Sequence, residues 1–411
     1  MKPRLSDIAR NLSVSAATVS LALSGKGRVS NEMVARIKAE ANRLHALVCL
    51  KQGKCDLALA LLNRALENCK KDDRAPETHR NVLYDFGELY YLRGEMDKAL
   101  EFLGRYRAVM STEDMIPQIR ADLFEGKIHH AQGRFQRAVA LYSQAYTLAR
   151  QTSSLSDLAN ASNQMGNARR DEGQYSEAER HFKSALEIWN RIGMTEFVAG
   201  AHINLGNLAM SHGDFRQSRE HHQEALAAFE KIGNVRGVTL AQINLAIAAI
   251  ELGEGPEAVK MAQAAIDNLG STGNALLLGQ SLVILGESYL ACEDWNCAQE
   301  IFDRVLAEFE ECNHPLAHAG ACRGLGRVHL MQQSAGQAQA LLLKALERFE
   351  QLQREQEAAR TLLHLAHALW AEGEADQANE KIMKARERFR TLGARVDMER
   401  AESLIREFGG K

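Results

Sequence analysis

Residues 14–30 combine hydroxyl and basic side chains in one short stretch, which reads VSAATVSLALSGKGRVS. Serine and threonine hydroxyls hydrogen-bond to phosphate oxygens, and lysine and arginine attract phosphates through their charge. Residues 1–43 contain eight Lys or Arg and three Asp or Glu, a local charge of +5 in a chain whose formal net charge is −3. This asymmetry predicts a small anion-binding segment joined to an acidic remainder.

Three short helices are expected to position these side chains. Ser6, Ser15 and Ser30 each precede an apolar helical pattern, and serine at such a place caps a helix N-terminus. A tight turn at residues 12–14 joins the first two helices. The residues expected to face the core of this domain are Ile8, Ala9, Leu12, Val19, Ala22, Leu23, Val34, Ile37 and Ala41.

The stretch LSDIARNLSVSAATVSLALSGKGRVSNEMVARI resembles the DNA-binding headpiece of LacI-type repressors over about 40 residues. The resemblance implies a helix-turn-helix domain whose second helix enters the major groove of double-stranded DNA. Hydroxyl side chains and backbone N–H groups would then hold the phosphates. The residues expected to contact DNA are Ser6, Ser15, Ala16, Ala17, Thr18, Ser20, Leu21, Lys26, Arg28 and Ser30.

The segment departs from the LacI-type pattern in three respects. Ala16, Ala17 and Leu21 occupy the base-facing positions, so contacts to thymine methyl groups are expected to replace most hydrogen bonds to bases. Ser13 stands where the family usually has glycine. The linker and hinge helix of LacI-type repressors are missing, because residues 30–52 contain neither Pro nor Gly and predict one helix that continues into the next domain.

The remainder of the chain repeats with a period close to 40 residues. Gly94, Gly133 and Gly173 are each followed five residues later by Ala, and the register extends from Gly53 to Gly373. The spacings are 41, 39 and then 40 residues six times, which makes nine repeats. Apolar residues between these marks have helical spacing and predict two antiparallel helices per repeat. Neither helix can bury its apolar face alone, so neighbouring repeats must stack into a solenoid.

This pattern resembles the tetratricopeptide repeat (TPR) in its longer form, over residues 44–393. The resemblance implies an all-α protein with three parts. A helix-turn-helix domain of three helices would occupy residues 1–43, and a right-handed α-solenoid of about nine TPR repeats would occupy residues 44–393. Residues 394–411 would form a C-terminal capping helix over the last repeat.

Asparagines recur on the first helices of consecutive repeats, which in this kind of repeat line a concave groove. A side-chain amide donates and accepts hydrogen bonds, which suits the backbone of an extended peptide. The asparagines resemble those of kinesin-light-chain-type and bacterial peptide-sensing repeat proteins. The alternative is that they are solvated or bond between helices. The residues expected to bind a peptide or protein are Asn160, Asn163, Asn167, Arg170, Asn204, Asn207 and Asn244.

The sequence contains no pattern typical of an enzyme. It has no phosphate-binding loop, no nucleophile elbow and no acid–base pair. The adjacent histidines at 129–130 and 221–222 would point about 100° apart on a helix, so they are expected to be solvated. The cysteines at 292, 297, 312 and 322 lack the close pairs of a zinc site. We therefore expect no catalytic residues, no metal and no cofactor.

Two further features bear on location. No apolar run approaches the roughly 18 residues of a membrane span, and the N-terminus MKPRLSDIAR lacks the apolar stretch of a signal peptide. The seven cysteines lie inside helical patterns, which is typical of reduced thiols. We expect a cytoplasmic protein that does not contact a membrane.

These observations predict a sequence-specific transcriptional regulator whose TPR domain binds a peptide or protein. A homodimer formed through the repeats is expected, because one head of this kind covers only a half-site on DNA. The alternative is a TPR scaffold for protein–protein interaction, with a helix-turn-helix-like cap that is non-functional or purely structural.

Overall fold

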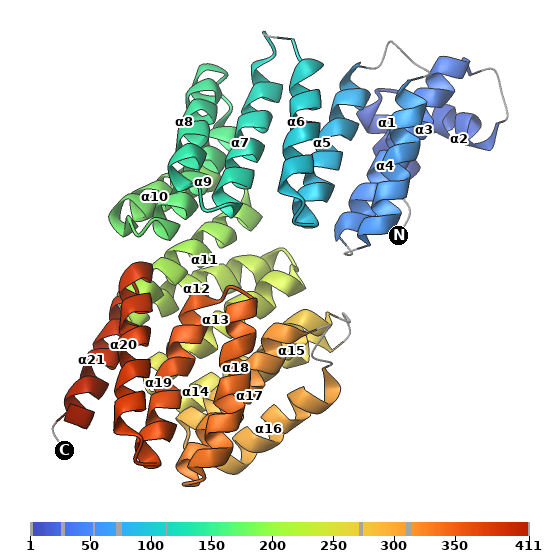
Figure 1. The fold of residues 1–411 in the computed structure, drawn as a ribbon. Coiled ribbons are helices and arrows are strands. Elements are labelled where there is room, and N and C mark those ends of the chain that lie inside the picture. Colours follow the sequence, from blue (N-terminus) through green and yellow to red (C-terminus); the bar gives the residue numbers. More distant parts are fainter. Residues whose placement is uncertain are drawn as a thin grey trace. The chain divides into compact units, whose positions relative to one another are not determined.

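The computed structural model describes residues 3–25, 29–51, 54–70, 76–111, 113–270, 274–309 and 314–409. The regular structure of these residues is entirely helical, which confirms the all-α prediction (Figure 1). The chain separates into two compact units, Met1–Ala168 and Arg169–Lys411. The boundary falls inside α9 (Leu155–Asp171), and the two units are described separately below.

The first unit begins with a three-helix domain, which we call the head. Its helices α1 (Leu5–Asn11), α2 (Ala16–Ser24) and α3 (Asn31–Lys51) contact one another around a small apolar core. The residues buried in this core are Ile8, Ala9, Val19, Ala22 and Ile37. All five were expected to face inward, so the predicted apolar faces of the head helices are confirmed for these residues.

Two of the three predicted helix caps in the head are confirmed. Ser15 Oγ accepts a hydrogen bond from the backbone N–H of Thr18 at 3.0 Å. Ser30 Oγ accepts one from the backbone N–H of Met33 at 3.2 Å. Each serine thereby satisfies one of the backbone donors that a helix N-terminus leaves without an intrahelical partner.

Two local predictions in the head are wrong. Ser6 does not cap α1, because the helix already begins at Leu5 and the extended backbone of Arg4 precedes it, without a side-chain cap. Leu23 does not pack inward but is 41% exposed. It lies in the last turn of α2, where Val19 one turn earlier already fills the core.

The predicted continuous helix between head and repeats is confirmed. α3 runs without a break over its 21 residues, and its second half pairs with α4 (Cys55–Cys69) as the first repeat. The remaining helices of the first unit are α5 (Pro76–Leu92), α6 (Met96–Ala108), α7 (Met115–Ala131), α8 (Phe135–Gln151) and most of α9.

The second unit continues the same series of helix pairs and ends with a single helix. The helices are α10 (Tyr175–Arg191), α11 (Thr195–His212), α12 (Phe215–Lys231), α13 (Val235–Glu251), α14 (Gly255–Leu269), α15 (Ala275–Ala291), α16 (Trp295–Glu308), α17 (Pro315–Met331), α18 (Ala335–Gln351), α19 (Glu355–Ala371), α20 (Ala375–Leu392) and α21 (Arg395–Gly409). Within the described ranges the chain thus forms nine helix pairs, as the repeat register predicts.

Glycines make the tight geometry of each repeat possible. Gly173 lies between the two helices of its repeat with φ +82°, a left-handed conformation that costs a side chain about 1–2 kcal/mol. Inside helix α15, Gly286 lets the paired helix approach, since a Cβ there would lie 2.5 Å from Cε1 of Phe302. Glycines between the helices and glycines inside them therefore have separate physical causes.

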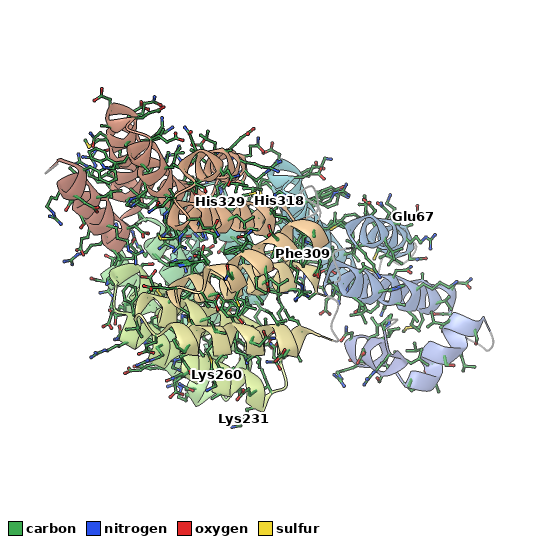
Figure 2. The ribbon with its side chains drawn as sticks, turned by 90° about the horizontal axis from the view of Figure 1, so that it is seen from below. Glu67, Lys231, Lys260, Phe309, His318 and His329 are labelled. Atoms are coloured by element: carbon green, nitrogen blue, oxygen red, sulfur yellow. The ribbon has the colours of Figure 1, made fainter. Side chains whose placement is uncertain are left out.

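The second unit is layered, with inner and outer helices. α13 contacts α15, α15 contacts α17, and α17 contacts α19, although each pair is separated by another helix in sequence. In a curved stack, neighbouring repeats come closest on the inside, so these are the inner helices. The stack curls until α21 contacts α11 (Figure 1). Lys231 and Lys260 are exposed on the outer helices α12 and α14 (Figure 2).

Candidate functional site

The exposed face of α2 in the head is small and uncharged. Ala16, Ala17, Ser20 and Leu21 are all exposed, and Leu21 is 44% exposed despite being apolar. These residues lie opposite the buried side of the helix, so they form the surface that a groove of DNA would meet. The surface offers methyl groups and one hydroxyl, which fits the expectation of few hydrogen bonds to bases.

The hydroxyls expected to hold phosphates are partly engaged within the head. Ser15 Oγ and Thr18 Oγ1 lie 2.8 Å apart and share a hydrogen bond, in addition to the capping bond from Thr18 N. Ser6 and Ser30 are exposed. The predicted contacts Lys26 and Arg28 lie outside the described residues.

The turn between α1 and α2 contains a residue under strain. Ser13 has φ +53°, in the left-handed region, and its position is fixed by the neighbouring bond from Val14 N to the Ala9 carbonyl at 3.0 Å. Glycine, which the LacI-type pattern usually has here, adopts this conformation without cost. The structure thus gives a physical reason for that feature of the pattern.

A buried polar network joins the head to the second repeat. Asn11 of α1 donates through Nδ2 to Oε1 of Glu40 at 2.7 Å, and Arg43 binds both Glu40 oxygens at 2.9 Å. Arg43 Nη1 also donates to Oδ2 of Asp85 in α5 at 3.0 Å. Glu40 and Asp85 are each 2% exposed. The shared helix α3 is therefore held on one side by the head and on the other by a repeat.

Burial dominates the electrostatics of this network. It raises the pKa of Asp85 to about 7, although Arg43 acts in the opposite direction and Glu88 adds to the rise. Burial also opposes the charge of Arg43, but its hydrogen bonds and ion pairs with Glu40 and Asp85 outweigh this and raise its pKa. This network was not predicted from the sequence, because 42 residues separate Arg43 from its partner Asp85.

The residues predicted to bind a peptide are divided between the two units. Asn160, Asn163 and Asn167 belong to the first unit, where they are half-buried, and Asn167 Nδ2 donates to Gln164 Oε1 at 3.5 Å. The second unit contains Arg170, Asn204, Asn207 and Asn244, which are also half-buried.

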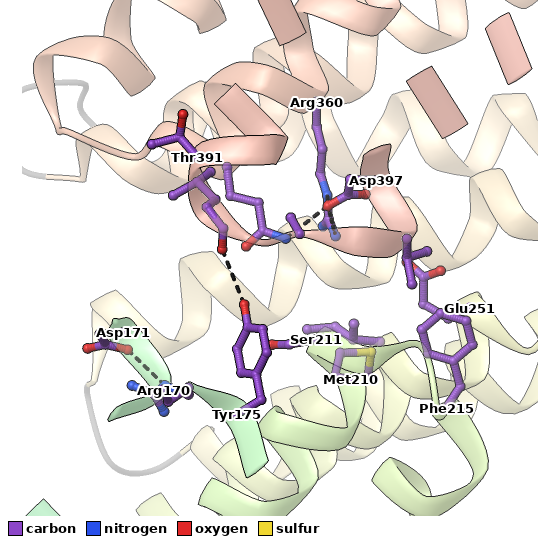
Figure 3. A pocket seen from close by; sticks show the side chains of 15 residues that line it. Arg170, Asp171, Tyr175, Met210, Ser211, Phe215, Glu251, Arg360, Thr391 and Asp397 are labelled. Atoms are coloured by element: carbon purple, nitrogen blue, oxygen red, sulfur yellow. Dashed lines mark hydrogen bonds and ion pairs between the residues drawn. The ribbon is translucent and has the colours of Figure 1, made fainter. Parts of the chain in front are cut away.

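The second unit contains a cavity where its two ends meet. It has a volume of about 460 Å³ and is lined by residues of α9, α10, α11, α12, α13, α19, α20 and α21 (Figure 3). Tyr175 closes one side, because its hydroxyl donates to the carbonyls of Leu392 and Gly393 at 3.2 and 3.3 Å. Arg170 lines this cavity and is paired with Asp171 at 2.9 Å.

Among the described residues, Asn204, Asn207 and Asn244 do not line the cavity. Its lining includes instead charged side chains of the C-terminal helices. Arg360 binds Asp397 Oδ2 through Nε and Nη2, both at 2.9 Å (Figure 3). These residues were not predicted from the sequence, because only the curvature of the repeats brings α19 and α21 near α11 and α13.

Charged residues also connect the inner helices α15 and α17. Glu287 of α15 binds Arg323 at 3.2 Å and also binds Arg327, both on α17. Burial raises the pKa of Glu287, but the positive charges of Arg327 and Arg323 outweigh it, and the pKa is lowered overall. Glu287 is therefore an ionised carboxylate held by two guanidinium groups.

Two kinds of feature are absent from the described part of the chain. It contains no group of three or more His, Cys, Asp or Glu side chains that could hold a metal ion. None of its helices is long and apolar enough to cross a membrane.

Solved structures show which fold the chain shares. The apo form of RapI is similar with a TM-score of 0.64 and 10% identity, over 86% of this chain and 98% of that one. A Rap protein complexed with Competence and Sporulation Factor gives a TM-score of 0.57 and 17% identity, over 91% and 98%. The apo form of the quorum sensor NprR from B. thuringiensis gives 0.59 and 13%, over 88% and 100%. At these identities the likeness concerns the fold.

Family models match an N-terminal segment and most of the repeats. Residues 4–45 match the lacI family of bacterial regulatory proteins, and residues 38–111 match the tetratricopeptide repeat. Residues 87–387 match the MalT-like TPR region. No curated protein sequence matches the chain. Because the MalT-like model covers most of its length, the chain belongs to the MalT-like TPR family, and it has a lacI-family head fused to its N-terminal end.

Proposed function

We propose that this protein is a sequence-specific DNA-binding regulator of transcription whose repeats bind a peptide or protein partner. The observation that carries the proposal is the lacI-family head built on α3, a helix that is also the first helix of the repeat array. The protein acts in the cytoplasm, where its DNA is, and has no catalytic role.

DNA recognition rests on the exposed face of α2. Ala16, Ala17 and Leu21 contact base edges, and Ser20 lies beside them at the groove wall. Ser6, Ser15, Thr18 and Ser30, together with Lys26 and Arg28, hold the phosphates. Because the base-facing side chains are apolar, specificity depends on thymine methyl groups and on the exclusion of poorly fitting bases.

Two heads act together. A single head buries too little surface for tight binding, and LacI-type heads read half-sites. We therefore propose a homodimer formed through the repeats that reads an inverted repeat in DNA.

The partner binds on the inner surface of the repeats. The Rap protein complexed with Competence and Sporulation Factor has a similar fold, which supports the proposal that these repeats also hold a partner. Asparagines that recur in the repeats supply the amides that an extended peptide needs, and Asn167, Asn207 and Asn244 are the ones we propose to test. Replacing them with Ala should remove partner binding and leave DNA affinity without the partner unchanged.

In vitro selection of DNA by the full chain tests the function. We expect the wild type to select an inverted repeat and Leu21→Arg to select a different motif, because position 21 faces the bases. Thr18→Ala should weaken binding to all sequences alike. Selection of the same motif by wild type and Leu21→Arg would remove Leu21 from the groove, and no selected motif at all would favour the alternative scaffold with a structural cap.

A further inference from the structure

Three arginines gather on the inner helices of the second unit. Arg323 and Arg327 of α17 share a single carboxylate, that of Glu287. Arg360 lies on the next inner helix, α19, and binds Asp397 of α21. The inner helices α17 and α19 therefore present guanidinium groups on neighbouring repeats.

The surroundings of His364, beside these arginines, are positively charged. It lies on α19 one turn after Arg360 and is half-buried. The pKa of its imidazole is lowered well below the usual value by burial and by the positive charges of Arg327 and Arg323, to which His367 and Arg360 add. Cations therefore outweigh carboxylates around His364.

Arg323 has a donor that the described part of the chain leaves unused. Its Nη1 is buried and has no hydrogen-bond partner, although its Nη2 binds Glu287. A buried charged donor without an acceptor is costly, so proteins rarely retain one without a reason. An acceptor supplied from outside the chain would satisfy it.

We propose that Arg323, Arg327 and Arg360 bind a carboxylate of the partner peptide on the inner surface. A guanidinium group presents paired N–H donors that match the two oxygens of a carboxylate, and each of these arginines already binds a carboxylate within the chain. Arg360 also lines the cavity beside α10 and α11, so a peptide anchored here has space for a neighbouring side chain. This inference rests on the proposed function, in which the partner lies on the inner surface.

The test measures binding of fluorescein-labelled tetraglutamate with a free C-terminus to the full chain, by fluorescence anisotropy at low salt. Tetralysine serves as the opposite-charge probe. We expect tetraglutamate to bind at least tenfold more tightly than tetralysine, and binding to weaken at least tenfold in Arg323→Gln/Arg327→Gln. The matched control Lys231→Gln/Lys260→Gln removes the same charge from the outer helices of the same unit and should change binding less than twofold.

Arg360→Gln provides a second variant that keeps the fold, because Asp397 remains bound to Arg400 at 3.1 Å and Gln356 at 2.9 Å. It should also weaken tetraglutamate binding. Amidation of the probe distinguishes the source of the carboxylate: unchanged binding assigns it to acidic side chains, and loss of binding assigns it to the C-terminus.

Equal weakening by the inner and outer double variants would overturn the proposal, because net charge alone would then explain binding. Failure of tetraglutamate to bind the wild type would also overturn it. Neither result would contradict the proposed DNA binding, because the DNA selection experiment measures that function separately.

Discussion

Replacing Asp85 with Asn tests how the head is joined to the repeats. In the folded chain the pKa of Asp85 is raised from 3.8 to about 7. A change of one pKa unit corresponds to a free energy of about 1.4 kcal/mol. Ionised Asp85 therefore destabilises the folded state by about 4 kcal/mol relative to its protonated form. The amide introduced by Asp85→Asn would keep an oxygen for Arg43 and remove that cost.

The sign of the pH dependence follows from the same shift. The unfolded chain releases this proton near pH 4 and the folded chain releases it near pH 7. Between these values the folded state binds more protons, so stability falls as pH rises and stays lower above pH 7. Arg43 and Arg120 oppose this rise in pKa, and Glu88 adds to it. We expect Asp85→Asn to be more stable than wild type at pH 8 and equal to it near pH 4.

Hydrogen exchange of α3 and α5 is the suitable assay, because it reports local opening of these helices. The three tryptophans at 189, 295 and 370 all lie in the second unit, so their fluorescence serves as an internal control that should not change. At pH 8 the variant should exchange at least tenfold more slowly than wild type. Asp97→Asn, an exposed carboxylate on α6, is the matched control with little effect. Faster exchange in Asp85→Asn at pH 8 would refute the reasoning, because the ionised pair would then be stabilising.

Three other changes have defined outcomes. Ser13→Gly should stabilise the head by about 0.5–1 kcal/mol, because it relieves a left-handed serine, and chemical denaturation followed by helix content measures it. Gly206→Ala should destabilise the second unit by about 1–3 kcal/mol, since the new Cβ would lie 2.5 Å from the buried ring of His222. The control on the same helix is Gly200→Ala, whose new Cβ meets open space and should stabilise the second unit. Trp fluorescence measures the unfolding of both variants, and equal effects on stability would contradict the packing argument. A Gly-Ser linker inserted after Arg43 should leave DNA and partner binding intact but uncouple them, and a full response to the partner in that variant would exclude the shared helix as the connection.

The sequence predicted the repeat architecture well because each repeat carries its own local signals. Gly173 and Gly213 stand where the backbone is left-handed, and the same register places Glu293 and Gln333 in that conformation at φ +58° and +57°. Periodicity of small residues thus located the turns even where glycine is absent. Continuity of α3 was also predictable, because it follows from the lack of Pro and Gly in one segment.

Features that depend on distant residues were beyond the sequence. The pairing of Arg43 with Asp85, and of Arg360 with Asp397, requires knowing how far each repeat rotates relative to the next. The cap expected at Ser6 failed for a local reason, since the helix begins at Leu5 and the residue before it is Arg4. Side-chain contacts between helices of different repeats therefore cannot be predicted from the repeat pattern alone.

Recovery of DNA bound in cells tests the central claim most directly. The full chain and an Ala17→Glu variant, which places a negative charge on the exposed face of α2 without touching the core, would be compared at equal abundance. The claim predicts that the wild type enriches a defined set of genomic sites that share an inverted repeat, and that Ala17→Glu loses them. Wild-type recovery no greater than that of the variant would show that the head does not read DNA.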